Sequence, residues 1–149
     1  MNRDRPSGLA FDLVAALRAR LNARAAGWWR LAGDTLELVA FAPADDLPET
    51  VAEGFTSATA LVPLAATELG IVRAVLTGGP AVSRIEELSA DGGSGLWLRR
   101  FGAVRSIAVP ARDASGTIVR VVSVALAGDQ PNDQAVAVLI RAAAETWAE

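Results

Sequence analysis

The sequence predicts an α/β (α+β) domain with a central antiparallel sheet of five to six strands and helices on both faces. Strand-forming segments come as hairpins near both ends of the chain, and short strands alternate with helices between them. A helix with apolar residues at helical spacing is expected at each end. The chain has 149 residues and no repeat or linker, so we expect 1–149 to form a single domain.

The first elements are predicted to be a helix and a hairpin. Apolar residues recur at helical spacing over residues 7–25, with Ser7 as the cap and Gly27 as the end. Residues 28–31 and 35–42 are rich in strand formers and flank a tight turn at residues 33–34. The adjacent Trp28 and Trp29 should therefore face opposite sides of the sheet.

The middle of the chain is predicted to alternate short helices with short strands. Glycine and proline mark the boundaries, with a strong stop signal at Gly78-Gly79-Pro80. The expected elements are a helix starting at residues 45–48, an extended piece at 60–64, a helix at 67–77, a strand at 81–85 and a helix at 94–101, which Ser94 caps.

The last third is predicted to be a long hairpin followed by a helix. Residues 105–112 and 117–127 are dense in Val and Ile, and turn-forming residues separate them. Pro110 indicates a bulge or a missing ladder bond in the first strand. The final helix is expected over residues 131–148, with one apolar stripe that includes Val136, Leu139, Ile140, Ala143 and Trp147.

The composition excludes much of the chemistry that enzymes use. The chain has no Cys, His, Tyr or Lys, and all 14 basic residues are Arg. It therefore has no thiolate nucleophile, no soft-metal site, no imidazole proton shuttle, and no lysine for a Schiff base or a phosphate loop. We expect a non-catalytic protein with no catalytic residues, no metal and no cofactor.

A carboxylate cluster leaves one catalytic alternative open. Asp45, Asp46, Glu49 and Glu53 gather around a predicted helix start. Oxygen ligands of this kind suit magnesium or calcium, or acid–base chemistry. Acidic residues at a helix start are also favoured by the helix dipole when they are simply solvated, and this second interpretation is preferred. An enzyme that uses carboxylates alone remains a third hypothesis.

The charge pattern bears on partners and location. The net charge is −3, whereas nucleic-acid modules are usually strongly basic, so no nucleic-acid partner is expected. No apolar stretch is long enough to span a membrane, and no targeting segment is evident. We therefore expect a soluble, cytoplasmic protein without a membrane partner.

Several segments, in the same order along the chain, together resemble a GAF domain, the small-molecule sensory fold related to PAS domains. Residues 69–80 look like the family's helix leading into a T-G-x-P turn, here Thr77-Gly78-Gly79-Pro80. Residues 105–110 (RSIAVP) look like its R-S-x-x-x-P strand, and residues 113–126 look like its next turn and strand. The chain departs from the pattern at Arg120, where a small Gly is usual.

The resemblance implies an arrangement of the helices, and the composition then excludes several ligands and activities known in the family. It implies that the first and last helices pack on one face of the sheet, often as a dimer bundle, while the middle helices and loops enclose a ligand pocket on the other. Bilin attachment and free methionine sulfoxide reduction require Cys in this family. Haem ligation requires His, and the cyclic-nucleotide motif contains Lys. The composition excludes all four.

The first functional hypothesis is a sensory or regulatory domain that binds an unidentified small molecule. Arginine side chains on the elements that would line the pocket can bind carboxylate or phosphate. The aromatic pair Trp97 and Phe101 could add a wall. The alternative is that the aromatics are core and the arginines, including Arg99 and Arg100, are surface. The candidate ligand-binding residues, for a small anionic or aromatic metabolite, are Arg73, Trp97, Phe101 and Arg105.

The second hypothesis is a ligand-free protein–protein interaction module that forms a homodimer through its terminal helices. It rests on the apolar stripe of the last helix, which a monomer must cover. The two hypotheses are compatible. The candidate interface residues are Leu13, Leu17, Val136, Leu139 and Trp147.

Overall fold

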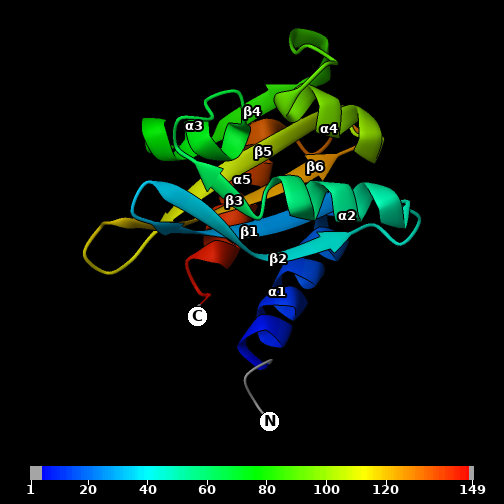
Figure 1. The fold of residues 1–149 in the computed structure, drawn as a ribbon. Coiled ribbons are helices and arrows are strands. Elements are labelled where there is room, and N and C mark those ends of the chain that lie inside the picture. Colours follow the sequence, from blue (N-terminus) through cyan, green and yellow to red (C-terminus); the bar gives the residue numbers. More distant parts are fainter. Residues whose placement is uncertain (1–4, 148–149) are drawn as a thin grey trace.

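A computed structural model describes residues 5–147, with side chains from residue 8 onward. The strands form one sheet with helices on both faces (Figure 1). The helices are α1 (Arg5–Leu21), α2 (Glu49–Ala58), α3 (Gly70–Thr77), α4 (Gly93–Phe101) and α5 (Asp133–Ala144), with a 3-10 turn η2 (Ile85–Glu87). The strands are β1 (Ala25–Ala32), β2 (Thr35–Pro43), β3 (Leu61–Pro63), β4 (Ala81–Arg84), β5 (Arg105–Arg112) and β6 (Ile118–Leu126).

The sheet has six strands in the order β3-β2-β1-β6-β5-β4, and every neighbouring pair is antiparallel. This confirms the predicted fold class. The β5–β6 pairing is irregular at Ala111/Arg112, and Pro110 pairs in register with Val121. The bulge predicted at Pro110 therefore lies one residue further along β5, between Ala111 and Arg112. β4 pairs only with residues 105–108 of β5, so Pro110 lies where β5 has a free edge, the position at which a sheet tolerates proline.

The two faces of the sheet carry different helices, as the resemblance implied. α1 and α5 cover one face, and α2, α3 and α4 cover the other (Figure 1). Trp28 lies in the core beneath α1 and α5, and Trp29 lies in the core beneath α3. The two tryptophans therefore point to opposite faces, which confirms the prediction made from strand alternation.

The boundaries of α1 correct the predicted ones. The helix already includes Ser7, so this serine is not its cap, and Gly27 lies within β1 rather than at the helix end. α1 ends at Leu21 because Asn22 turns into the left-handed region with φ 51°. Asn adopts this conformation more readily than most residues, so it ends a helix as glycine often does.

Three other helices begin later than predicted. α2 begins at Glu49 directly after Pro48, and α3 begins at Gly70. α5 begins at Asp133, where the side chain of Asn132 accepts a hydrogen bond from the N–H of Ala135 at 2.8 Å. Asn132 is thus a true N-cap, which the sequence interpretation placed inside the helix.

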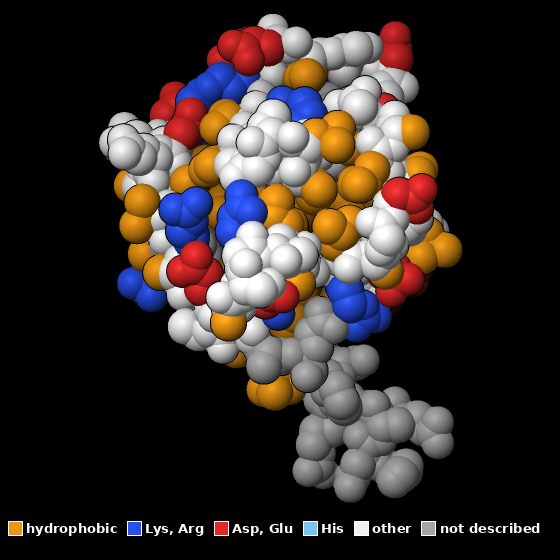
Figure 2. Space-filling view, turned by 90° about the vertical axis from the view of Figure 1, so that its left-hand side faces the viewer, with side chains coloured by type: hydrophobic (Ala, Val, Ile, Leu, Met, Phe, Trp, Pro, Cys, Tyr) orange, Lys and Arg blue, Asp and Glu red, His pale blue; other side chains and the backbone are white. Residues whose placement is uncertain are grey.

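The molecular surface mixes apolar and charged side chains. On the side that carries α3 and the hairpin turns, hydrophobic side chains reach the surface between arginine and carboxylate groups (Figure 2). Leu61 of β3 and Leu76 of α3 are 66% and 56% exposed. Within the described residues, no helix is long and apolar enough to cross a membrane.

Candidate functional site

A cavity of about 50 Å³ lies between the sheet and the helices α2, α3 and α4. Its floor is formed by β1, β5 and β6, and its walls by side chains from the three helices and β2. The volume is enough for a few water molecules but well below the 150 Å³ of an engineered cavity that binds benzene. The cavity therefore has room for only a small group as it stands.

The floor is hollow because its side chains are small. In the sheet register, Ala25 lies beside Ala125, which pairs with Ser106, and in the next row Gly27 lies beside Ser123. These five residues all line the cavity. On the opposite face, the same strands carry larger side chains, including Trp28, Ile107, Val109, Val122 and Val124. Small residues on one face thus leave the space that the cavity occupies.

Five aromatic rings form one wall of the cavity, and Phe55 of α2 stands at their centre. The centroid of its ring lies 5.0 Å from Phe41, 5.3 Å from Trp97, 5.1 Å from Phe101 and 6.0 Å from Trp29. Three of these contacts are edge-to-face, the arrangement that the ring quadrupole favours.

Three serine hydroxyls supply polar groups to the cavity. Ser94 was predicted to cap the helix in which it lies, but its Oγ accepts a hydrogen bond from the N–H of Gly70 at 3.2 Å. It therefore caps α3 instead of α4. The hydroxyls of Ser106 and Ser123 have no hydrogen-bond partner among the described residues. No charged side chain of the described residues lines the cavity.

The predicted ligand-binding residues are only partly brought together. Trp97 and Phe101 line the cavity, as the first hypothesis requires. Arg73 does not line it, and its guanidinium donates to the Oγ of Ser83, the cross-strand partner of Ser106. Arg73 thus lies just beyond the cavity edge.

The two arginines of α4 serve local structure. Arg99 donates to the carbonyl oxygens of Gly95, Ile85 and Leu88, which ties α4 to the segment before it. The guanidinium of Arg100 lies 5.1 Å from the ring centroid of Trp97, on the exposed side of the helix. Neither side chain lines the cavity.

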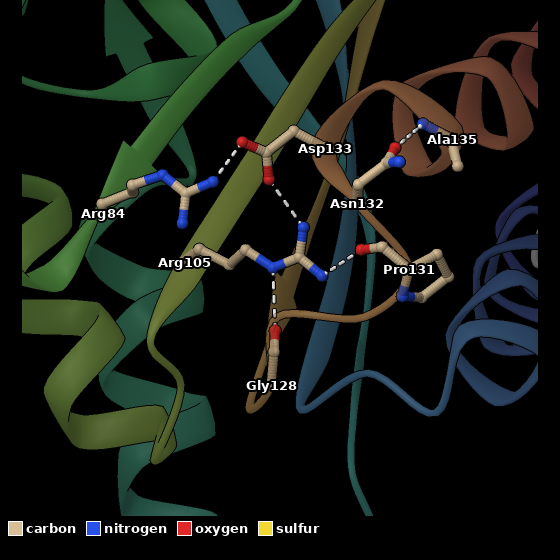
Figure 3. Close-up of polar contacts among 7 residues, drawn as sticks. All are labelled: Arg84, Arg105, Gly128, Pro131, Asn132, Asp133 and Ala135. Atoms are coloured by element: carbon tan, nitrogen blue, oxygen red, sulfur yellow. Dashed lines mark hydrogen bonds and ion pairs between the residues drawn. The ribbon is translucent and has the colours of Figure 1, made fainter.

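The placement of Arg105 is a correction to the sequence analysis. The residue is fully buried, but its guanidinium lies on the α5 side of the sheet and does not line the cavity (Figure 3). It donates to the carbonyl oxygen of Gly128 at 2.8 Å, to a carboxylate oxygen of Asp133 at 2.6 Å, and to the carbonyl of Pro131. All three donor nitrogens are thus used to hold the start of α5.

Asp133 joins two strands to this helix. Its second carboxylate oxygen accepts from Arg84 of β4, which pairs with Arg105 in the sheet (Figure 3). Burial acts to raise the pKa of Asp133, but the hydrogen bonds from Arg105 and Arg84 outweigh it and hold this pKa below its ordinary value. The same contact raises the pKa of Arg84.

The predicted dimer residues lie largely in the chain's own core. Leu17 of α1, Val136 of α5 and Trp147 are buried in the core between these helices and the sheet. Leu13 and Leu139 are half-buried and pack against this core. The apolar stripe of α5 therefore covers the protein's own sheet, so the three buried residues are not available to a second copy. Trp147 stacks on Trp28 at 5.0 Å, and this pair closes the core at the end of α5.

Arg120 packs where the family pattern has glycine. Its guanidinium lies 5.5 Å from the ring centroid of Trp28 and donates to the carbonyl oxygen of Ala144 at 3.2 Å. A cation at the C-terminal end of a helix is favoured by the dipole of α5. The larger side chain thus ties β6 to the end of that helix.

The acidic cluster does not assemble into a site. Asp46 forms an ion pair with Arg24 at 2.7 Å, and this hydrogen bond lowers the pKa of Asp46 below its ordinary value. Asp45, Glu49 and Glu53 line an open groove beside α2. Among the described residues, no group of three or more acidic side chains lies close enough to hold a metal ion.

Much of the cavity is lined by residues that the sequence did not predict. Trp29, Phe41 and Phe55 come from β1, β2 and α2, and nothing local marks them as neighbours. The alternation of Ala, Ser and Gly with larger residues in the strands is the one signal that could have indicated a hollow face, since adjacent strand residues face opposite sides.

Comparisons with known proteins support the fold. No protein-family model and no curated protein matches the sequence. The GAF domain/HD domain protein from Geobacter sulfurreducens has a TM-score of 0.68 at 13% identity, over 94% of this chain and 87% of that one. Free methionine-R-sulfoxide reductase from Neisseria meningitidis, in complex with its substrate, has a TM-score of 0.63 at 16% identity, over 94% and 74%.

A third structure extends the comparison. The phycoerythrobilin-bound GAF domain from a cyanobacterial phytochrome has a TM-score of 0.59 at 11% identity, over 94% of this chain and 85% of that one. Identities this low show the fold alone. With its six antiparallel strands, its terminal helices on one face and its cavity on the other, the chain has the GAF-domain fold.

Proposed function

We propose that the chain is a non-catalytic sensory or regulatory domain that binds a small molecule between its sheet and the helices α2, α3 and α4. The observation that carries this proposal is the cavity itself, where aromatic rings face a floor of small residues. Such a space, mostly apolar with a few polar groups, is the usual form of a small-molecule site.

The fold and the composition support the same function. The phytochrome GAF domain with this fold is described with a bound bilin, and the reductase with its substrate, so the fold holds small molecules in other proteins. The reductase also shows that the fold can serve an enzyme. This chain has no Cys, His, Lys or Tyr, so a binding role requires less of its side chains than catalysis does.

A thermal-shift screen with a metabolite library tests the proposal. A ligand present at 100 times its dissociation constant should raise the free energy of unfolding by about 2.7 kcal/mol. The matched control is Ala125→Leu, which places a larger side chain on the cavity floor and should abolish the shift. The proposal fails if no metabolite stabilises the wild type, or if the same ligand stabilises Ala125→Leu equally.

We also propose dimerisation, through the outward side of the terminal helices instead of their buried stripe. Leu9 on α1 and Val138 on α5 are 54% and 60% exposed, although both are large and apolar. A homodimer that covers these side chains could form whether or not a ligand occupies the cavity.

Sedimentation velocity tests dimerisation. We expect a dimer in the wild type and a monomer in Val138→Asp, with unchanged folding by circular dichroism because the residue is exposed. Leu76→Asp on α3 introduces the same charge at a similarly exposed site on the other face, and it should remain dimeric. A wild-type monomer at high protein concentration would contradict this proposal.

A further inference from the structure

Among the residues that the structure describes, no charged side chain lines the cavity. Its polar side-chain groups are the hydroxyls of Thr59, Ser94, Ser106 and Ser123 and the indole N–H groups of Trp29 and Trp97. Thr59 already donates to the carbonyl oxygen of Phe55 at 2.8 Å, and Trp29 donates to the carbonyl oxygen of Thr59 at 3.0 Å. The remaining lining is apolar or backbone. A charged ligand would leave water without gaining an opposite charge, which is strongly unfavourable.

The arginines near the cavity do not change this balance. Arg73 donates to Ser83 beyond the cavity edge, and Arg105 is held by Asp133 and two carbonyl groups on the opposite face of the sheet. The guanidinium of Arg105 therefore cannot neutralise an anion in the cavity. The guanidinium of Arg73 lies beside the cavity-lining Gly70, with its Nη2 3.6 Å from a Cβ built there, but this nitrogen donates to Ser83 and does not line the cavity. In the described part of the chain no carboxylate lines it either, so a cation would also be unpaired there.

The two free hydroxyls define where a polar ligand would bind. Ser106 pairs with Ala125, and Ser123 pairs with Ala108, so the two serines are diagonal neighbours on β5 and β6. Diagonal neighbours are about 7–8 Å apart in an antiparallel sheet. Each hydroxyl can donate and accept a hydrogen bond, and neither is used by the protein in the described part of the chain.

We propose that the ligand of this cavity is an uncharged small molecule, such as an amide or an alcohol, that hydrogen bonds to Ser106 and Ser123. The inference rests on the proposed function of the cavity and specifies its ligand class. Of the anionic or aromatic metabolite that the sequence predicts, it replaces the anionic alternative, because Arg105 does not line the cavity. The volume of about 50 Å³ limits a ligand that binds without rearrangement to a few non-hydrogen atoms.

A titration with three probes of similar size tests the ligand class. Propionamide, propionate and n-propylammonium are added separately to the isotope-labelled protein, and the backbone amide signals of residues 70, 106 and 123 are followed by NMR. Propionamide should bind with a dissociation constant at least tenfold lower than either charged probe.

Serine variants test the position. Ser106→Ala and Ser123→Ala should each weaken propionamide binding about 2- to 10-fold, the usual effect of one lost hydrogen bond, and should leave the melting temperature nearly unchanged. Ser83→Ala is the matched control, because Ser83 lies opposite Ser106 on the same face but accepts from Arg73 and does not line the cavity. It should lower the melting temperature and leave the dissociation constant unchanged.

Two kinds of failure are distinguishable. If propionate or n-propylammonium perturbs the same amides at lower concentration than propionamide does, the cavity is a binding site but the inferred ligand class is wrong. A charged metabolite found in the thermal-shift screen and lost in Ala125→Leu would overturn the ligand class in the same way. If neither the probes nor the screen detects binding at the cavity, the proposed function itself fails, and the inference fails with it.

Discussion

At the scale of single residues, Gly27 shows how one position makes room for a large side chain. The indole of Trp29 lies over this glycine, and a Cβ built there would be 2.5 Å from Cη2 and 2.6 Å from Cζ3 of that ring. Trp29 is almost fully buried, and its Nε1 donates to the carbonyl oxygen of Thr59 at 3.0 Å. The ring is therefore not free to move aside.

Gly27→Ala should accordingly destabilise the protein. We expect a loss of about 1–3 kcal/mol in the free energy of unfolding, the usual cost of overpacking a core. Gly79→Ala is the control, because a Cβ at Gly79 meets nothing within 4 Å and its backbone conformation is ordinary. Urea denaturation measures both variants, and equal stability of the two would contradict the steric argument.

At the scale of elements, β4 and β5 connect the cavity side of the sheet with the start of α5. Ser83 pairs with Ser106, and the neighbouring pair is Arg84 with Arg105. Because adjacent strand residues face opposite sides, the serines face the cavity side and the arginines face α5. Asp133 at the first turn of α5 binds both guanidinium groups.

Asp133→Asn should weaken this connection strongly. The variant leaves the buried guanidinium of Arg105 without a counter-charge, and breaking a buried pair from one side costs about 3 kcal/mol in unfolding free energy. The control is Asp46→Asn, which removes an exposed ion pair to Arg24 and should cost far less. Chemical denaturation at pH 7 measures both losses.

The pH dependence gives a second measurement of the same variant. The pKa of Asp133 is lowered in the folded state, so the ionised carboxylate contributes stability above its unfolded pKa, near 3.8, and loses it as the pH falls through the lowered folded value. The stability difference between wild type and Asp133→Asn should therefore be constant near neutral pH and shrink below about pH 4. A difference that stays constant down to pH 2 would show that the charge of Asp133 contributes nothing.

At the scale of the whole molecule, the two layers of helices meet differently filled faces of one sheet. α1 and α5 pack on large apolar residues around Trp28, whereas α2 and α4 face a floor of Ala, Ser and Gly. The first layer is a filled core, and the second retains a cavity. This asymmetry separates a structural half of the domain from a half that can admit a ligand.

Neighbouring residues of β6 test the asymmetry, since Ser123 faces the cavity and Val124 faces the helix pair. Ser123→Val adds apolar volume to an underfilled space and should raise the free energy of unfolding by about 0.5–1 kcal/mol. Val124→Ser leaves a void and buries a hydroxyl, and it should lower that free energy by about 2–4 kcal/mol. Differential scanning calorimetry compares the two, and opposite signs are the expected result.

The sequence by itself determined the order of elements and the fold class. The hairpins at residues 28–42 and 105–127 and the amphipathic terminal helices were all predictable, because turn residues and hydrophobic periodicity are local signals. The GAF-like motifs added the placement of helices on the two faces. Helix starts were less predictable, since capping depends on contacts such as that between Ser94 and Gly70.

Only the tertiary structure decided which side chains form the cavity. β5 is buried on both faces, so its sequence has no polar–apolar alternation to tell which residues face the ligand side. Arg105 and Ser106 are adjacent, and the packing of α5 on one face places the arginine against Asp133 and leaves the serine for the cavity. The absence of Cys, His and Lys excluded thiolate, imidazole and Schiff-base chemistry. The register of the sheet determined which polar groups remain for a ligand.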